Sequence, residues 1–284
     1  MSAQSSPLNI RWLRAFALAG LCTALVGGAA CTFDSASNGS TPAAQAEPAS
    51  FDQLTGRVLE LYYGDDPDGA TLLAEQALNL AETDQGPDHP ATAIALNNLA
   101  FLYDTAGRHG EAEPLYQRAM AIDAETLAAD DLDLALTLNN LAVSYALTGR
   151  YDEAEPLAQQ ALAIRQARLG PDHIDTYNSL INLGFTYQLL GRYSEAEPLY
   201  QEALAIAEAK LGPNHSATAD RLQNLGELYQ AMGRDDAAAP LLERAAAIQS
   251  APSAEGPDPA CDRPPVVGAG RLGYSAAQAA IDCP

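Results

Sequence analysis

The chain has 284 residues, of which 48% are hydrophobic and 18% charged, and its 37 acidic and 15 basic residues give a formal net charge of −22. This composition indicates a folded protein rather than a disordered one. Because a negative field repels phosphate groups and anionic lipid headgroups, the charge argues against nucleic acid as a partner and against lipid binding by the folded part of the chain.

The first 31 residues have the layout of a secretory signal. Arg11 and Arg14 precede an apolar run over residues 15–26, and small residues then lead to Cys31. A basic region, an apolar region and small residues before a cleavage point are the three parts of such a signal. Small residues that end in a cysteine also resemble a bacterial lipoprotein signal, which implies that Cys31 is acylated, although Gly28 stands where Leu is usual.

Residues 32–50 are rich in Ser, Ala, Gly, Pro and Asn, as expected of a flexible tether. Two alternatives to lipidation stay open: cleavage at another point, such as Ala44-Gln45-Ala46, which would give a secreted protein, and an uncleaved N-terminal anchor. The prediction is therefore an exported protein, with a periplasmic or outer-membrane-associated lipoprotein as the first choice.

From residue 51 to residue 250 the sequence repeats itself with a period of 42. The residues that recur include Gly107, Gly149, Gly191 and Gly233; Pro114, Pro156, Pro198 and Pro240; and Leu99, Leu141, Leu183 and Leu225. A fixed period in this range is typical of an array of supersecondary units. The predicted units are residues 91–134, 135–176, 177–218 and 219–250, and a degenerate unit over residues 51–90 precedes them.

Each unit is predicted to be a pair of helices. In the unit 177–218, one helical face is formed by Leu180, Leu183, Gly184 and Tyr187. Gly191 ends this first helix and, like Gly149 one unit earlier, is expected to have a positive φ.

The second helix of a unit is predicted to begin with a capping box. The boxes are Ser194 with Glu197 and, one unit earlier, Asp152 with Glu155. Pro198 would then lie within the first turn, where a missing N–H costs little.

The repeated residues resemble the tetratricopeptide repeat, in the 42-residue variety of kinesin light chains. The match is carried by Leu-Asn-Asn-Leu-Ala runs at 96–100 and 138–142, by Glu-Ala-Glu-Pro-Leu and Leu-Gly-Pro-Asp-His segments, and by Leu99, Ala100, Tyr103, Gly107, Ala112, Tyr116 and Ala119. It covers residues 91–249 and, more faintly, residues 51–90. The resemblance implies an all-α, right-handed α-solenoid of helix-turn-helix repeats. It implies little about function, because such arrays serve many unrelated processes.

The repeat stops at residue 250. The tail, residues 251–284, is rich in Pro, Gly and Ala and contains Cys261 and Cys283. Because an exported compartment permits disulfides, a bond between these two cysteines is predicted, and the alternative is a pair of unbonded thiols.

Three histidines recur with the repeat, but they do not predict a metal site. Equivalent residues of neighbouring units, here His89, His173 and His215, are at least one helix-to-helix distance apart, about 8–10 Å. Ligands of one zinc ion lie about 2.0–2.1 Å from it and must converge. The sequence also has no glycine-rich phosphate loop, no Cys-x-x-Cys and no nucleophile motif, so neither an enzyme nor a cofactor is predicted.

One asparagine position of the first helix recurs in all four units, at Asn98, Asn140, Asn182 and Asn224. In peptide-binding tetratricopeptide arrays the matching asparagine hydrogen-bonds the backbone of the ligand, so the resemblance implies an asparagine ladder along a concave groove. Further predicted groove positions include Asn97, Asn139, Phe101, Phe185 and Gln188. The alternative is that each asparagine bonds the neighbouring helix pair and serves only the geometry of the solenoid.

The predicted function is a non-catalytic scaffold that binds a peptide or protein segment in the groove, at the cell envelope. Because the groove positions hold no Lys or Arg pair of the kind with which some relatives grip a C-terminal carboxylate, the expected ligand is neutral or basic. The arginines of the turns, such as Arg150 and Arg192, are expected to cap helix ends. The alternative function is a structural envelope component that assembles with itself or within a larger complex, and the oligomeric state stays open.

Overall fold

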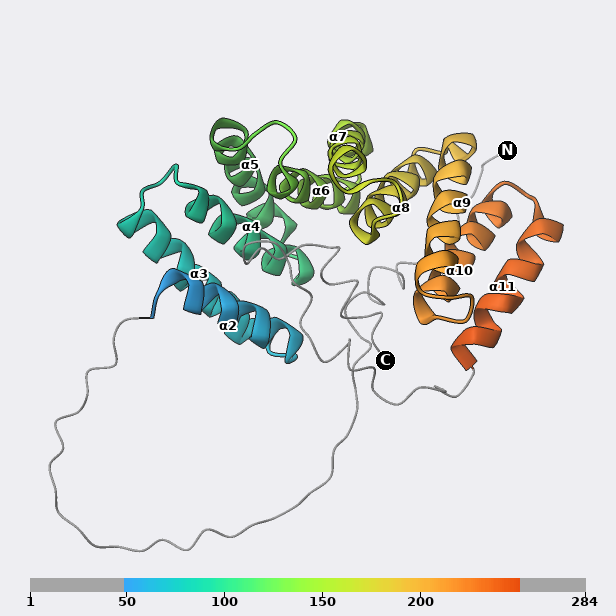
Figure 1. Cartoon of the computed structure of the whole chain (residues 1–284), viewed down its shortest axis with the longest axis horizontal. Helices are drawn as coiled ribbons and strands as arrows, with labels where there is room; N and C mark the ends of the chain where they lie inside the picture. Colours follow the sequence, from blue (N-terminus) through green and yellow to red (C-terminus); the bar gives the residue numbers. More distant parts are fainter. Residues whose placement is uncertain (1–48, 251–284) are drawn as a thin grey trace, which may run out of the picture.

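The computed structural model describes residues 49–250, apart from the side chain of Ile174. In this part of the chain ten α-helices follow one another through short turns and form an open arc (Figure 1). Their bounds are α2 Phe51–Tyr63, α3 Pro67–Asp84, α4 Pro90–Thr105, α5 His109–Thr126, α6 Leu132–Leu147, α7 Tyr151–Leu169, α8 Ile174–Leu189, α9 Tyr193–Lys210, α10 Ser216–Ala231 and α11 Asp235–Ser250. The expected all-α solenoid is confirmed.

The helices alternate between two layers of the arc. Figure 1 shows α5 and α7 on its outer side and α6 and α8 on its inner side. We call α4, α6, α8 and α10 the inner helices, and α5, α7, α9 and α11 the outer helices. Each inner helix packs against the outer helix that follows it and against the one that precedes it, so the apolar core is continuous along the arc.

The turn inside each unit depends on a residue with positive φ. Gly149 and Gly191 have φ values of 80° and 73°, which confirms the expected sign. The N–H of Arg192 donates to the carbonyl of Tyr187 (2.8 Å) and closes the end of α8 as in a Schellman motif. In the leading unit Asp65 takes the glycine position with φ of 63°, a conformation that a short polar side chain tolerates.

The outer helices begin earlier than predicted, and the two capping boxes, Ser194 with Glu197 and Asp152 with Glu155, are wrong. α9 begins at Tyr193, and its N-cap residue Arg192 makes no side-chain capping bond; Arg150 caps α7 in the same way. The box glutamates do not reach back to the helix start because arginines of the next unit bind their carboxylates. Pro198 therefore lies inside α9, where its missing N–H removes one helical hydrogen bond.

Three of the inner helices begin at a histidine. The Nδ1 atoms of His89, His173 and His215 each accept a hydrogen bond from the backbone N–H two residues further on, at 3.1 Å. In the remaining linker the carboxylate of Asp131 does the same with the N–H of Asp133 (2.9 Å). The histidines are thus linker residues that start the next helix, and residues 49–250 contain no cluster of side chains suited to a metal ion.

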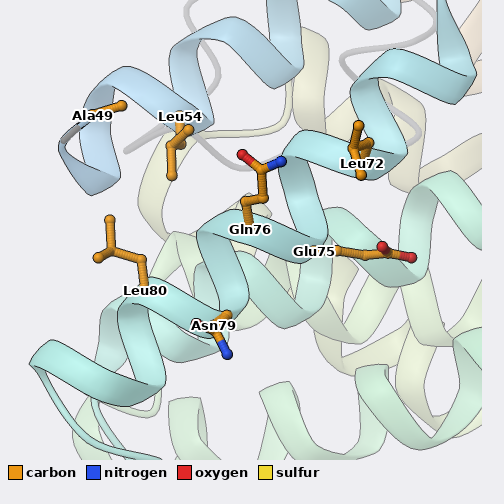
Figure 2. Close-up of a pocket in the computed structure, with 7 residues that line it drawn as sticks. All are labelled: Ala49, Leu54, Leu72, Glu75, Gln76, Asn79 and Leu80. Carbon is orange, nitrogen blue, oxygen red and sulfur yellow. The ribbon is translucent and has the colours of Figure 1, made fainter. Parts of the chain in front are cut away.

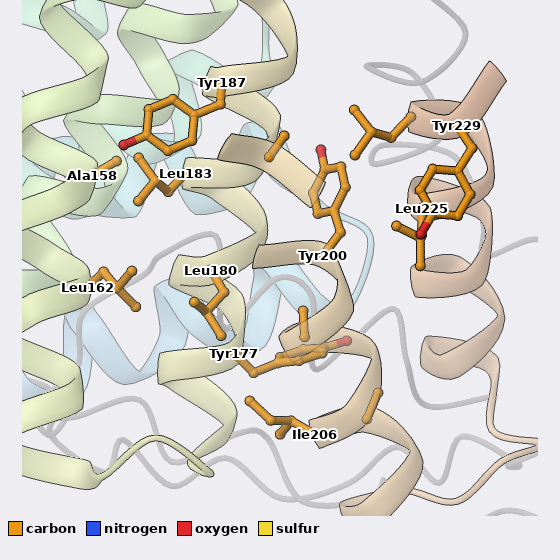
Figure 3. Close-up of a cluster of buried hydrophobic side chains, with 14 of the residues drawn as sticks. Ala158, Leu162, Tyr177, Leu180, Leu183, Tyr187, Tyr200, Ile206, Leu225 and Tyr229 are labelled. Atoms are coloured by element: carbon orange, nitrogen blue, oxygen red, sulfur yellow. The ribbon is translucent and has the colours of Figure 1, made fainter. Parts of the chain in front are cut away.

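The predicted core face of the unit 177–218 is buried. Leu180, Leu183 and Tyr187 of α8 pack among side chains of α7, α9 and α10 (Figure 3). The ring of Tyr200 lies directly against Gly184, where an added Cβ would be 2.7 Å from Cε1 of the ring. Glycine at this position therefore lets α8 and α9 approach closely.

Cys31, Cys261 and Cys283 lie outside the described residues, so the lipid site and the disulfide stay predictions. Among the helices of residues 49–250, none combines the length and the apolar character needed to cross a bilayer.

Candidate functional site

The asparagine ladder joins the inner helices to one another. Asn140 Nδ2 of α6 donates to Asn97 Oδ1 of α4 (2.9 Å), and Asn182 Nδ2 of α8 donates to Asn139 Oδ1 of α6 (3.0 Å). Within α4, Asn97 Nδ2 also donates to Asn98 Oδ1 (3.4 Å). These are the bonds of the alternative interpretation, in which an asparagine holds the neighbouring helix pair.

The ladder stops at α10. Ile181 stands in α8 where α4 and α6 have the accepting asparagine, and the side chain of Asn224 makes no hydrogen bond to the described residues. Asn139 is only 1% exposed, yet its Nδ2 has no hydrogen-bond partner in this part of the chain. Because buried amide N–H groups are nearly always bonded, Asn139 has a donor to offer to a ligand, and so does Asn224.

Phe101 and Phe185, the two predicted apolar contacts, differ in accessibility. The ring of Phe101 is buried and packs edge-on against Tyr62 of α2, with 5.3 Å between ring centres. Phe185 is 37% exposed and lies one turn from Asn182 on α8. Gln188, about one turn further on, accepts a hydrogen bond from Tyr200 OH (3.0 Å). Of the two phenylalanines, Phe185 is therefore the one that a ligand can reach.

Two buried arginines flank α8, and the groove prediction missed both. Arg165 Nη1 of α7 donates to Ser179 Oγ (2.7 Å), and burial lowers the pKa of this arginine. Arg221 Nε of α10 donates to Tyr177 OH (2.5 Å), and the guanidinium carbon lies 5.1 Å from the centre of the tyrosine ring. Arg221 is 4% exposed, and its Nη2 has no hydrogen-bond partner among the described residues.

The sequence did contain a signal for Arg221. In the other three units the residues at its repeat position are all small: Ala95, Thr137 and Ser179. A long charged side chain in a register of small ones departs from what packing alone requires. Reading the repeat for its deviations rather than for its consensus would have found this residue.

An acidic side chain also belongs to this region of α10. Glu227 occupies the repeat position of Phe185 and is half-buried. Its carboxylate accepts a hydrogen bond from Gln223 Nε2 (3.1 Å), and burial raises its pKa. The inner helices thus change from an apolar to a charged side chain between α8 and α10.

A second polar network recurs from unit to unit on the helix pairs. Arg192 lies over the ring of Tyr187, 4.4 Å from its centre, and donates from Nε to Glu195 (2.6 Å) and from Nη1 to Glu155 of the preceding unit (2.5 Å). Gln159 Nε2 donates both to Glu155 (2.9 Å) and to Tyr187 OH (2.9 Å). We call this set the Arg-Tyr-Glu clasp.

The clasp recurs at Arg150 and, with fewer contacts, at Arg108 and Arg234. The prediction that these arginines cap helix ends is wrong, because their guanidinium groups bind carboxylates instead. The adjacent arginines hold the pKa values of Glu153 and Glu195 below their usual range. The repeated Gly-Arg and Glu-Ala-Glu-Pro segments therefore join units.

Both ends of the described array lack the groups of the clasp. In the leading unit, Leu61 and Asp66 stand where the later units have the tyrosine and the arginine. In α11, Ala239 stands where the earlier units have the glutamate that binds the arginine of the next unit. The clasp therefore cannot continue beyond either end.

A shallow hollow of about 420 Å³ lies at the leading end, between α2 and α3 (Figure 2). Leu54, Leu72 and Leu80 give it an apolar floor, and Leu72 is 57% exposed. Its polar lining consists of two amides, Gln76 and Asn79, and one carboxylate, Glu75, which accepts a hydrogen bond from Tyr103 OH. These groups provide no nucleophile with an adjacent base, so the hollow is part of the exposed end of the array rather than a reaction site.

Comparison with known proteins agrees with this architecture. A kinesin light chain candidate from Podosopora anserina, with nearly identical TPR-like repeats, is 27% identical, with a TM-score of 0.60 over 69% of this chain and 93% of that one. BtubC (BKLC) from P. vanneervenii is 26% identical, with a TM-score of 0.63 over 73% of this chain and 83% of that one. No curated protein matches the chain. The family model described as tetratricopeptide repeat matches residues 61–125, 133–209 and 175–251, more than half of the sequence. With its 42-residue helix pairs, the chain therefore belongs to the tetratricopeptide repeat family and has repeats of the kinesin-light-chain type.

Proposed function

We propose that this protein is a non-catalytic scaffold that binds an extended segment of another protein across its inner helices α6, α8 and α10. The tetratricopeptide fold is one of protein-protein interaction scaffolds, which supports the general class. The observation that carries the proposal is the set of unused groups on these three helices. Asn139 Nδ2 and the Asn224 side chain have no hydrogen-bond partner in the described part of the chain, and Phe185 is exposed between them.

These groups suit an extended segment. An asparagine amide donates to a backbone carbonyl whatever the side chain of that residue, so Asn139 and Asn224 recognise an extended backbone rather than a sequence. Phe185 supplies the apolar contact, because an aromatic ring offers a large surface for a ligand side chain to cover. The asparagines that bond each other keep the inner helices at a fixed spacing and thereby position these groups.

The alternative function, assembly of copies into a longer structural array, is less well supported. Stacking in the repeat register would bring α11 of one copy against α2 of the next. The groups of the Arg-Tyr-Glu clasp are missing there, because Ala239 replaces the glutamate and Leu61 and Asp66 replace the tyrosine and the arginine. A copy-to-copy junction would therefore lack the ion pairs and ring contacts that join the units within the chain.

The test is capture of partners by the immobilised full chain from an envelope extract. The double variant Phe185→Ala/Asn224→Ala should retain its melting temperature and lose at least tenfold in partner binding, about 1.4 kcal/mol. Leu72→Ala is the matched control, since it removes another exposed apolar side chain far from the inner helices of these units. Equal capture by all three proteins would place the partner elsewhere, and concentration-dependent assembly in light scattering would favour the structural alternative.

The same proposal includes a location at the cell envelope. It is supported by the signal layout of residues 1–31, with Arg11 and Arg14 before the apolar run and Cys31 as the lipid site. Cys31→Ser should then move the protein from the membrane fraction to the soluble one. Unchanged fractionation would exclude lipidation and leave an uncleaved anchor or ordinary secretion.

A further inference from the structure

The group that the solenoid itself explains least is the guanidinium of Arg221. It is 4% exposed, its hydrogen bond goes from Nε to the neutral phenol of Tyr177, and Nη2 has no partner in the described part of the chain. An arginine stays protonated at any physiological pH, and a buried charge without a counter-ion is strongly destabilising. Packing does not require it, because the other units have small residues at this position.

We propose that Arg221 is the subsite for a single carboxylate of the bound segment, either an Asp or Glu side chain or a C-terminal carboxylate. This inference rests on the proposed function and names the chemistry of its ligand. A carboxylate matches the planar donor face of a guanidinium and forms with it the strongest class of hydrogen bond. Phosphate matches it less well here, because the net charge of −22 opposes each additional negative charge on the ligand more strongly.

The neighbours of Arg221 support the same chemistry. Asn224 follows one turn later on α10, on the same side of the helix, and its side chain makes no hydrogen bond to the described residues. It can therefore donate to the second oxygen of a carboxylate bound by Arg221. Arg165, held by Ser179 on the other side of α8, adds a second positive charge to this part of the array.

The expected preference for a neutral or basic ligand is revised by these residues. That expectation rested on the lack of basic side chains at the groove positions, and it did not include position 221. The acidic surface still disfavours a ligand with several acids, and Glu227 lies on the same helix. The best ligand therefore has one carboxylate in an otherwise uncharged or basic segment.

The geometry also fixes a spacing within the ligand. Neighbouring inner helices are about 8–10 Å apart. Phe185 lies about 9 Å further along its helix than the position of Arg221, at about 1.5 Å per residue over six repeat positions. The two side chains are thus roughly 13 Å apart, which an extended segment spans with about four residues at about 3.3 Å each.

The experiment is a selection of short random peptides on the immobilised full chain. The selected peptides should share one Asp or Glu about four residues from a large apolar residue. For the best peptide, Arg221→Gln in the protein and the change of the peptide acid to its amide should each weaken binding about tenfold. Together they should weaken it little more than either alone, which is the signature of a direct pair.

Arg234→Gln is the matched control, because it removes the same charge from the neighbouring turn without touching α8 or the start of α10. A loss of the same size with this variant would show a general charge effect and overturn the subsite. Peptides that bind without an acid, or whose acid does not couple to Arg221, would also overturn it while leaving the scaffold function intact. A selection that gives no binding peptide would contradict the scaffold function itself.

The tail of the chain is the other source of a carboxylate, and a further full-chain variant separates the two. In this variant Glu255, Asp258, Asp262 and Asp282 are changed to their amides. If this variant no longer loses stability when Arg221→Gln is added, whereas the wild type does, the carboxylate belongs to the chain itself and the partner subsite is wrong. If the peptide coupling is the same in both backgrounds, the subsite belongs to the partner.

Discussion

Removing the Asn182 side chain should destabilise the solenoid by more than removing Asn224, although the two residues occupy the same repeat position. Asn182 Nδ2 bonds Asn139 Oδ1, and Asn139 has no other side-chain hydrogen bond among the described residues. Asn182→Ala therefore leaves a buried amide entirely unpaired, which costs about 1–3 kcal/mol. For an array of this length, 1 kcal/mol corresponds to about 2–4 °C, so the melting temperature should fall by roughly 2–12 °C. Asn224→Ala breaks no such bond and should change stability by less than about 0.5 kcal/mol.

Thermal and urea unfolding followed by circular dichroism measure both variants. A further change, Asn139→Ile, copies the isoleucine that the next unit has at this position, Ile181. Added to Asn182→Ala, it should recover part of the loss, because replacing both partners of a buried hydrogen bond by apolar groups is nearly neutral. The stabilising role of the ladder would be refuted if Asn182→Ala cost no more than Asn224→Ala, or if the isoleucine deepened the loss.

Three other substitutions test the packing, the turn and the clasp. Leu183→Ala, in the core around α8, should lower the free energy of unfolding by about 2–5 kcal/mol in urea titrations. Gly191→Val should cost more than about 1 kcal/mol because φ is 73° there, whereas Gly110→Ala, in a helix with open space around it, should be neutral or slightly stabilising. The pKa of Glu195 is lowered by Arg192, so their ion pair stabilises the fold above the unfolded pKa of about 4.3 and this contribution is lost as the pH falls below it. The melting temperature of Arg192→Gln should accordingly lie below that of the wild type near pH 7 and approach it in acid.

The fold could be predicted from the sequence because each unit repeats the same packing problem. A period of 42, apolar residues at helical spacing and glycines at the turns are local features, and Gly149 and Gly191 have the expected positive φ. Where the prediction was wrong, contacts with the next unit prevailed over a local motif. Glu197 has the spacing of a capping box with Ser194, but its carboxylate binds Arg234 instead.

The candidate site was harder to predict, because a hydrogen-bond partner in a neighbouring unit leaves no local pattern. An asparagine that bonds a ligand and one that bonds the next inner helix look alike in sequence. Asn140 and Asn182 have partners 43 residues away in the chain, whereas Asn224 lacks one because of a single isoleucine at position 181. Only the three-dimensional structure separates the joined asparagines from the one that is left over.

The positions that break the repeat are the ones that packing leaves available for recognition. A residue that contacts both neighbouring units must suit the same surroundings in every unit, which explains why Leu183 and Gly191 recur unchanged. At Arg221 and Glu227 the chain departs from this rule, and both lie on α10, where the ladder of bonded asparagines has already stopped. A ligand that crosses the array therefore meets amide and apolar groups on α6 and α8 before it meets charge on α10. This polarity gives the bound segment one preferred direction, because a reversed segment would place its apolar residue beside a buried guanidinium and its carboxylate beside Phe185.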